Sequence, residues 1–232
     1  MDLVYLPTGK ATKKYTSVGV NTYRITVVAY GKGGSSTNVT KDVTVRSDFT
    51  VAPEIVTALT NNASKRWVVD KSVAGHLGVG PWNVASIRPE WWAGGVNEKV
   101  ASANCFSTAT FTFAKVAASG TYSLQVTTPD GAFTKTGSLT TLPGIPGSGD
   151  EGCYNYGGGT SAFSFVPASS GAPVVVTNAD NSTSTQTSIL LSGVDTFIGY
   201  GAVQKEYEIL VITSTYMYLR VQGTETGNAW YL

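Results

Sequence analysis

Hydrophobic and polar residues alternate with a period of two in many segments of the chain. In Tyr23–Tyr30 the apolar side chains fall mostly on one face, and in Val39–Val45 the valines at 39, 43 and 45 share one side. The residues between these segments, Gly31–Ser36, are mostly Gly and Ser and are typical of a turn. This pattern predicts two β-strands joined by a turn, each with one more apolar face.

Similar runs of β-branched and aromatic residues, separated by Gly, Asn and Pro, predict many further short strands. We expect them at Lys65–Val69, Thr108–Phe113, Gly120–Thr127, Phe133–Thr140, Ala162–Val166, Pro173–Val176, Ser188–Ser192, Tyr207–Thr213, Met217–Gln222 and Ala229–Leu232. Asp130-Gly131 is a tight-hairpin signal between two of them. A helical period is visible only in Glu54–Thr60, which predicts one or two turns of helix. The expected fold class is all-β, a β-sandwich or jelly roll.

Two irregular stretches suggest how the chain is organised. Arg46–Pro53 follows the second predicted strand, is largely polar and ends in proline, so we expect a domain boundary there. The predicted domains are residues 1–47 and 48–232. Leu142–Cys153 is rich in Pro and Gly, which interrupt strand ladders, and is expected to form a long surface loop.

Composition narrows the function classes. The formal net charge is +1 and 13% of residues are charged, which argues against a nucleic-acid partner because phosphate binding needs clustered Lys and Arg. Hydrophobic residues make up 42% of the chain, enough to form a core. No stretch approaches the roughly 20 apolar residues of a membrane span, and Met1–Lys10 does not resemble a signal peptide. Abundant Gly, Ser and Thr with sparse charge are common in exported β-proteins.

The two cysteines, Cys105 and Cys153, are far apart in sequence and lack the spacing of metal ligands. They form either one disulfide, as in many exported proteins, or two buried thiols. The sequence has no Asp-rich loop for calcium. We therefore expect neither a metal site nor a cofactor.

Four of the five tryptophans, Trp67, Trp82, Trp91 and Trp92, lie within 26 residues. Aromatic rings stack on the C–H faces of sugars, so this cluster predicts a carbohydrate-binding surface. Trp67 lies on a predicted strand and is expected in the core. Trp82 follows Gly80-Pro81 in a predicted loop and is the strongest candidate for an exposed platform. Trp91 and Trp92 are adjacent and should point in opposite directions.

Polar and aromatic neighbours complete the predicted site. Glu98 and Lys99 could bind sugar hydroxyls or could form a salt bridge within the loop, and the same alternatives apply to Asp70. Tyr154 and Tyr156 should share one side and could form a second side of the site or pack on the sandwich. His76, the only histidine, is included among the candidate ligand-binding residues. Because no nucleophile motif surrounds it, we expect hydrogen bonding rather than catalysis.

Two alternatives to simple binding follow from other features. Glu206 and Glu208 are two residues apart on a predicted strand, so they should share a face about 7 Å apart, near the carboxylate separation of inverting glycosidases. A sandwich-fold glycoside hydrolase is therefore one alternative, although the neighbouring Lys205 favours a solvated strand face. A structural or adhesive surface module without a ligand is the other.

The N-terminal segments resemble a known module. Lys13–Tyr30, its Gly-rich turn and the closing Val39–Val45 are similar to the second half of a PKD-type immunoglobulin-like module, with Tyr-Thr, Gly, a Tyr-Arg-Ile-Thr-Val strand and a Val-Thr-Val strand. The Trp-x-Phe-Gly-Asp-Gly strand typical of the first half of this family is absent from the sequence. The resemblance implies a partial immunoglobulin-like sandwich, with further chain expected before Met1.

The remaining segments resemble another family. Leu59–Trp67, Gly75–Pro81, Trp91-Trp92-Ala93 and Asn97–Lys99 are similar to motifs in the C-terminal domain of surface glycan-binding lipoproteins of Bacteroidota. Tyr207–Leu210, Leu219-Arg220 and Trp230-Tyr231 resemble that domain's closing strands.

This second resemblance implies a function and a location. It implies a lipoprotein on the extracellular face of the outer membrane, with its lipid anchor upstream, acting beside a SusC/SusD-type uptake complex. It also implies non-catalytic binding of a polysaccharide, with β-glucans such as laminarin as one ligand class. The sequence departs from the family pattern at Trp82 and at Cys105–Thr108, where an acidic pair is often found.

Overall fold

The computed structural model describes residue 9 and residues 13–116, 118–170, 185–225 and 227–232. The chain divides into two compact units, residues 1–50 and 51–232, with the division inside the predicted boundary segment. The predicted all-β class is confirmed: the described elements are β-strands, two short α-helices and one 3-10 helix. The predicted strand Pro173–Val176 lies outside the described residues.

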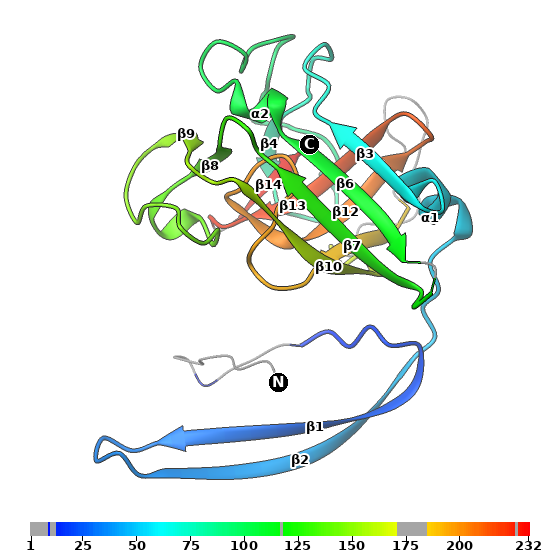
Figure 1. The fold of residues 1–232 in the computed structure, drawn as a ribbon, viewed down its shortest axis with the longest axis vertical. Helices are drawn as coiled ribbons and strands as arrows, with labels where there is room; N and C mark the ends of the chain where they lie inside the picture. The colour runs from blue at the N-terminus through cyan, green and yellow to red at the C-terminus, as the bar shows by residue number, and fades with distance from the viewer. Residues whose placement is uncertain (1–8, 10–12, 117, 171–184, 226) are drawn as a thin grey trace. The chain divides into compact units, whose positions relative to one another are not determined.

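The described part of the first unit is dominated by one long hairpin (Figure 1). Strands β1 (Gly19–Tyr30) and β2 (Ser36–Ser47) pair antiparallel along their full length, from Gly19↔Ser47 to Tyr30↔Ser36. One face carries three cross-strand pairs, Thr22–Thr44, Arg24–Asp42 and Thr26–Thr40, each joined by side-chain hydrogen bonds. The other face carries most of the apolar side chains, among them Tyr23, Ile25, Val27, Val39 and Val43, as the sequence pattern predicts.

The second unit is built around a ten-stranded antiparallel sheet with the order β3-β6-β7-β10-β11-β12-β13-β14-β4-β5. Its strands are β3 (Ser64–Val68), β4 (Gly78–Pro81), β5 (Trp92–Ala93), β6 (Thr110–Val116), β7 (Thr121–Thr127), β10 (Gly158–Pro167), β11 (Thr187–Leu191), β12 (Val203–Ile212), β13 (Met217–Gly223) and β14 (Asn228–Tyr231). Figure 1 shows β3, β6, β7 and β10 in front of β12, β13 and β14, so the sheet folds over on itself into a sandwich. Side chains such as Phe113, Leu124, Ile189 and Tyr207 are fully buried between the layers.

Helix α1 (Pro53–Thr60) opens this unit, one residue earlier than predicted. Pro53 occupies the first turn, where its missing N–H costs no hydrogen bond. Ile55, Val56 and Leu59 form the buried stripe that the sequence shows. Asn61, in the left-handed conformation with φ 51°, ends the helix.

A second, two-stranded sheet lies outside the main one. Strands β8 (Ala132–Lys135) and β9 (Glu151–Tyr154) pair antiparallel with each other. The predicted strand Phe133–Thr140 is therefore wrong beyond Lys135, because Gly137 at φ 73° begins the 3-10 helix η1 (Gly137–Leu139). The predicted loop Leu142–Cys153 is irregular only up to Asp150, since its last residues form β9.

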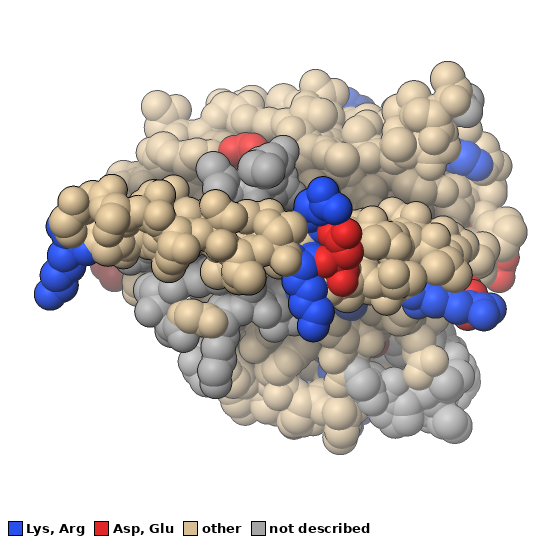
Figure 2. Space-filling view, turned by 90° about the horizontal axis from the view of Figure 1, so that it is seen from below, with Lys and Arg blue, Asp and Glu red and all other residues tan. Residues whose placement is uncertain are grey.

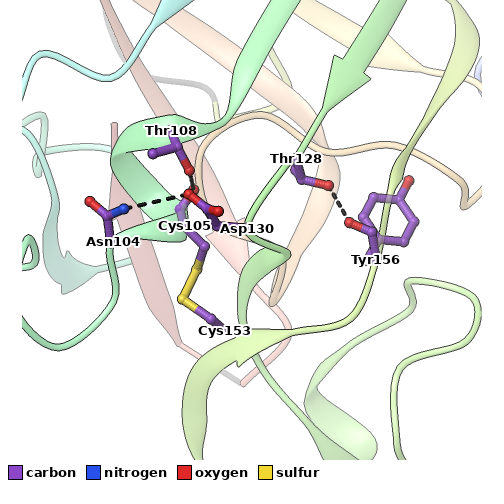
Figure 3. The surroundings of a disulfide bond; sticks show 7 residues. All are labelled: Asn104, Cys105, Thr108, Thr128, Asp130, Cys153 and Tyr156. Atoms are coloured by element: carbon purple, nitrogen blue, oxygen red, sulfur yellow. Dashed lines mark hydrogen bonds between the residues drawn. A yellow bond between two sulfur atoms is a disulfide. The ribbon is translucent and has the colours of Figure 1, made fainter.

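The cysteines form a disulfide, one of the two alternatives left open by the sequence. Cys105 begins helix α2 (Cys105–Thr108) and is bonded to Cys153 in β9. Figure 3 shows the bond between these elements, with Thr128 nearby donating a hydrogen bond to the carbonyl oxygen of Tyr156. The disulfide therefore ties the small β8–β9 sheet to a helix of the main unit.

A buried ion pair joins two neighbouring strands in the middle of the large sheet. Glu208 in β12 and Arg220 in β13 are cross-strand partners, and both side chains are at most 2% exposed. Arg220 donates from Nε and Nη2 to Oε2 of Glu208, at 3.0 and 2.6 Å. Its Nη1 donates to the carbonyl oxygens of Asn83 and Ser86, which closes the loop after β4 over the pair.

Removing the disulfide should destabilise the protein. The bond joins residues 48 apart in sequence, and freeing a loop of that length costs about 4 kcal/mol in the chain-entropy description. We expect Cys105→Ser/Cys153→Ser to lower the free energy of unfolding by about this amount, measured by urea denaturation. A double variant as stable as the parent protein would contradict a structural role for the bond.

Breaking the buried ion pair should be costly as well. Glu208→Gln leaves the Arg220 guanidinium buried without a counter-charge, so we expect a loss of about 3–5 kcal/mol in unfolding free energy. Glu206→Gln is the matched control, because Glu206 is only half-buried on the same strand. Urea denaturation of the two variants should differ clearly. Equal losses would show that the Glu208 carboxylate is not critical.

Candidate functional site

The four clustered tryptophans lie in different surroundings. Trp67 is buried at 9% exposure, with its Nε1 donating to the carbonyl oxygen of Leu59 at 2.9 Å. Trp82 is half-buried and its ring lies 5.2 Å from the guanidinium carbon of Arg220. Trp91 is 60% exposed. Trp92 is half-buried, so of these four rings Trp91, rather than Trp82, is the most open to solvent.

Trp82 helps cover the buried ion pair. It packs against a small core cluster on that side of the sheet, which contains Ile87, Leu210, Ala229 and Tyr231. The Tyr231 hydroxyl donates to the carbonyl oxygen of Ser86 at 2.9 Å, within the same loop. These contacts give Trp82 a packing role that its loop position in the sequence does not indicate.

Three other candidate residues make local contacts. Glu98 is exposed and its Oε2 accepts a hydrogen bond from the Gly95 amide at 2.5 Å. Tyr156 is buried at 9% exposure, and its hydroxyl donates to the carbonyl oxygen of Asp195. His76 is 8% exposed, with Nδ1 2.7 Å from the carbonyl oxygen of Val73. Each of them holds a segment of the chain in place.

Trp92 belongs to a row of side chains that crosses the sheet edge. Val79 in β4 is the cross-strand partner of Trp92 in β5 and also of Trp230 in β14. Directly opposed residues share a face of the sheet, so both indoles lie on one side with Val79 between them. Two strand spacings separate them, which is about 10 Å. Both rings are half-buried.

Lys99 connects this row to β9. Its ammonium nitrogen lies 5.2 Å from the centre of the Trp92 ring and 2.9 Å from Oε1 of Glu151. It also lies 5.4 Å from the centre of the Phe133 ring in β8. The predicted residues Trp92 and Lys99 are thus brought together, and the residue that joins them to the rest of the site is Glu151.

A pocket of about 480 Å³ opens beside Glu151, between the β8–β9 sheet and the end of the β13–β14 hairpin. We call it the β9 pocket. Its chemically distinctive lining residues are two aromatics, three carboxylates and one lysine: Tyr200, Trp230, Asp150, Glu151, Glu225 and Lys135. The buried amide of Asn228 also lines it and donates from Nδ2 to Glu225 at 3.2 Å.

Charges in the β9 pocket are largely balanced. Glu225 is paired with Lys135 at 2.8 Å, and Glu151 is paired with Lys99 at 2.9 Å. Within the described part of the chain, the Asp150 carboxylate has no ion-pair partner. Burial, together with Glu151 and Glu225, raises the pKa of Tyr200, so its hydroxyl stays protonated and able to donate. The pocket therefore offers both acceptors and donors.

A column of tilted aromatic rings, in contact one after another, supports the aromatic side of the pocket. The ring centres of Phe106 and Phe133 are 5.2 Å apart, those of Phe133 and Tyr200 are 5.2 Å apart, and those of Tyr200 and Trp230 are 4.3 Å apart. Phe106, Phe133 and Tyr200 are at most 2% exposed. Trp230 ends the column and is the ring with a partly open surface.

The sequence prediction missed most of this pocket. Asp150 and Glu151 lie in the Gly/Pro-rich segment that was predicted to be a surface loop, and Trp230 is far from the other tryptophans in sequence. Tyr154 was a candidate, and its hydroxyl donates to the carbonyl oxygen of Asp150 at 2.5 Å, just behind the pocket. The alternation of the last predicted strand was a usable signal, because it places the side chains of Trp230 and Tyr231 on opposite faces of the sheet.

The chain matches no protein-family model and no curated protein sequence. No helix in the described residues is both long and apolar enough for a membrane crossing. Where residues are described, no three His, Cys, Asp or Glu side chains are grouped to hold a metal ion. On the face shown in Figure 2, the described charged side chains lie in small separate groups, unlike the clustered cations of a phosphate-binding surface.

The Lys99–Glu151 pair should contribute modestly to stability. Its side chains are 19% and 32% exposed, so the attraction is partly screened by solvent. A double-mutant cycle with Lys99→Met and Glu151→Gln should give a coupling energy of about 0.2–1 kcal/mol. The coupling should shrink when unfolding is measured in high salt. Zero coupling at low salt would show that the pair does not hold β9.

Proposed function

We propose that the second unit, residues 51–232, binds a carbohydrate without catalysis, and that the ligand occupies the β9 pocket. The observation that carries this proposal is the placement of a half-open indole, Trp230, beside three carboxylates, a lysine and a protonated tyrosine hydroxyl. A sugar ring has an apolar C–H face and a rim of hydroxyls. Trp230 offers a surface for the C–H face, and the charged groups of the pocket offer hydrogen-bond partners for the hydroxyls.

The size and polarity of the β9 pocket support this proposal. Its volume of about 480 Å³ is within the range typical of small-molecule sites. Carboxylates accept hydrogen bonds from sugar hydroxyls, while the Lys135 ammonium can donate to them. Hydrogen bonds to charged groups contribute about 1.5–3 kcal/mol each. A few such bonds with one stacked ring give moderate affinity.

The row Trp92–Val79–Trp230 favours an extended ligand over a single sugar. It places a second indole on the same face as Trp230, two strands away. A glycan that stacks one sugar ring on Trp230 could place another of its sugars near Trp92 and Lys99. The proposed ligand is therefore a polysaccharide or oligosaccharide, and the resemblance noted in the sequence favours a β-glucan such as laminarin.

The same resemblance extends the proposal to a location and a partner in the cell. A chain of this kind would act on the extracellular face of the outer membrane as a lipoprotein, holding a glycan for a SusC/SusD-type uptake complex. Its motifs at Gly75–Pro81, Asn97–Lys99 and Trp230-Tyr231 support this extension.

The hydrolase alternative is less well supported. Glu208 is bonded to Arg220 and is 2% exposed, and Glu206 accepts hydrogen bonds from the amide and hydroxyl of Ser169. An acid–base pair needs one carboxyl group that can exchange its proton beside a substrate. Glu208 lacks that access. In the β9 pocket, Glu151 and Glu225 are each held in an ion pair with a lysine.

Affinity electrophoresis against a panel of polysaccharides tests the binding proposal. We expect one glycan class to retard the protein. Asp150→Asn and Glu225→Gln should each weaken this binding about tenfold or more, since each alters a charged hydrogen-bond acceptor. Trp91→Ala is the matched control, because Trp91 is exposed but does not line the pocket.

Three results would count against the proposal. A folded protein that no glycan retards would favour the structural alternative. Retardation abolished by Trp91→Ala but not by Asp150→Asn would place the site elsewhere. Release of reducing sugar from the retarding glycan, lost in Glu208→Gln when that variant is still folded, would favour the hydrolase.

A further inference from the structure

A second pocket lies at another place in the same unit, among β3, the loop that follows it, and β13. Its volume is about 200 Å³. We call it the β3 pocket. The residues that define its chemistry are Trp67, Val73, His76, Phe111, Met217 and Leu219. It shares no lining residue with the β9 pocket, so an inference about it does not rest on the proposed function.

The interior of the β3 pocket is mainly apolar. Trp67, Phe111 and Leu219 are buried at 9%, 2% and 1% exposure, and Ile198 and Leu232 also line the space. Besides His76, the polar side chains of the lining are exposed at Asp70, Thr215 and Tyr216 and half-buried at Tyr218. The buried interior therefore cannot satisfy a ring of hydroxyls, and leaving buried hydroxyls unpaired is costly. A sugar is therefore a poor occupant of this pocket. An apolar ligand is a good one.

The volume of the β3 pocket indicates the size of the occupant. An apolar cavity of about 150 Å³ is large enough to bind benzene. A space of about 200 Å³ can therefore hold one six-membered aromatic ring with a small substituent. Trp67 and Phe111 are suitable neighbours for such a ring, because aromatic rings pair well by offset or edge contacts.

His76 provides a hydrogen-bond acceptor beside the apolar residues of the β3 pocket. A carbonyl oxygen can only accept, so the 2.7 Å contact with Val73 requires Nδ1 of His76 to carry the proton and donate it. In the neutral ring, Nε2 is then an acceptor. Within the described part of the chain, Nε2 makes no hydrogen bond. The ring itself is held by Phe106, 5.9 Å away and close to parallel.

Asp70 adds negative charge at the edge of the β3 pocket. Its carboxylate accepts hydrogen bonds from the amide and hydroxyl of Ser72, at 3.1 and 2.5 Å, and these bonds lower the pKa of Asp70. The group is exposed and ionised at neutral pH. It disfavours an anionic ligand at the mouth of the pocket and favours one that presents a donor.

We infer that the β3 pocket binds a phenol-type group, a single aromatic ring bearing a neutral hydroxyl. The ring fills the space beside Trp67 and Phe111, and the hydroxyl donates to Nε2 of His76. The occupant could be a free phenol or an aryl group attached to a larger molecule. Both share the same ring and donor.

The single methionine in the described residues gives a direct reporter. Met217 lines the β3 pocket, and the sequence contains only one other methionine, Met1. The protein is labelled with methyl-¹³C methionine and titrated with p-cresol, and the Met217 methyl signal is followed by NMR. We expect a saturable shift, because an aromatic ring placed beside the methyl group changes its magnetic environment.

Variants and ligands separate the two parts of the inference. Ala74→Trp places a large side chain at an exposed position lining the pocket and should abolish the shift. His76→Phe should weaken p-cresol binding about tenfold through loss of the hydrogen bond but leave toluene binding unchanged. Trp91→Ala, outside the pocket, should change neither. His76→Gln keeps an acceptor and should restore part of the p-cresol affinity.

Three results would overturn the inference. The first is a Met217 signal that p-cresol does not move in a saturable way. The second is toluene binding as tightly as p-cresol to the parent protein, which would show that His76 plays no part. The third is a polysaccharide that shifts Met217 and is displaced by p-cresol, which would show that the pocket recognises a sugar instead.

Discussion

The disulfide between Cys105 and Cys153 joins α2 to β9, a strand that pairs with β8 in a small sheet apart from the ten-stranded one. With no ladder to the large sheet, this small sheet depends on a few other contacts for its position. The disulfide holds β9, while the Gly201 amide donates to the carbonyl oxygen of Phe133 in β8 and the tilted rings of Phe133, Tyr200 and Trp230 pack in series beside it. Asp150 and Glu151 face Trp230 because both restraints act together.

At the edge of the large sheet formed by β4 and β5, the other face is held by a different set of contacts. Strands β4 and β5 are short, and an edge of this kind gains little stability from its own hydrogen bonds. Arg220 binds the carbonyl oxygens of Asn83 and Ser86, so the loop between β4 and β5 is pinned to the central strands. Trp82 covers this arrangement. The row from Trp92 to Trp230 can therefore remain partly open on the other face.

Much of the fold follows from the alternation of residues, and much of the site does not. Strands β7 and β10 bury alternate side chains over several residues, which is why sequence patterns identify them. Strands β12 and β13 are recognised as runs of β-branched, aromatic and other apolar residues instead, because they are buried on both faces at residues 207–210 and 219–221. Strands β4, β5 and β9 are two to four residues long, too short for a period to be visible. Their ladders are set by the tertiary structure.

The tryptophan cluster illustrates the same limit for the site. Residues close in sequence were predicted to act together, yet Trp67, Trp82 and Trp91 lie in three separate environments. The neighbouring Lys205 led to the prediction that Glu208 lies on a solvated face. That prediction is wrong, because Glu208 pairs with the buried Arg220 on the next strand, a partner that spacing alone does not identify. Conversely, Trp230 and Trp92 come together because β4 pairs with both β14 and β5, a strand order that the sequence pattern does not specify.

The central claim is that a sugar ring stacks on Trp230 beside the carboxylates of Asp150, Glu151 and Glu225. A crystal structure of the second unit with a bound oligosaccharide, of the class that binds in solution, tests this most directly. The account predicts a pyranose ring against Trp230, with hydroxyls within hydrogen-bond distance of Asp150 or Glu225. Ligand density on the exposed face of Trp91, with the β9 pocket empty, would contradict it.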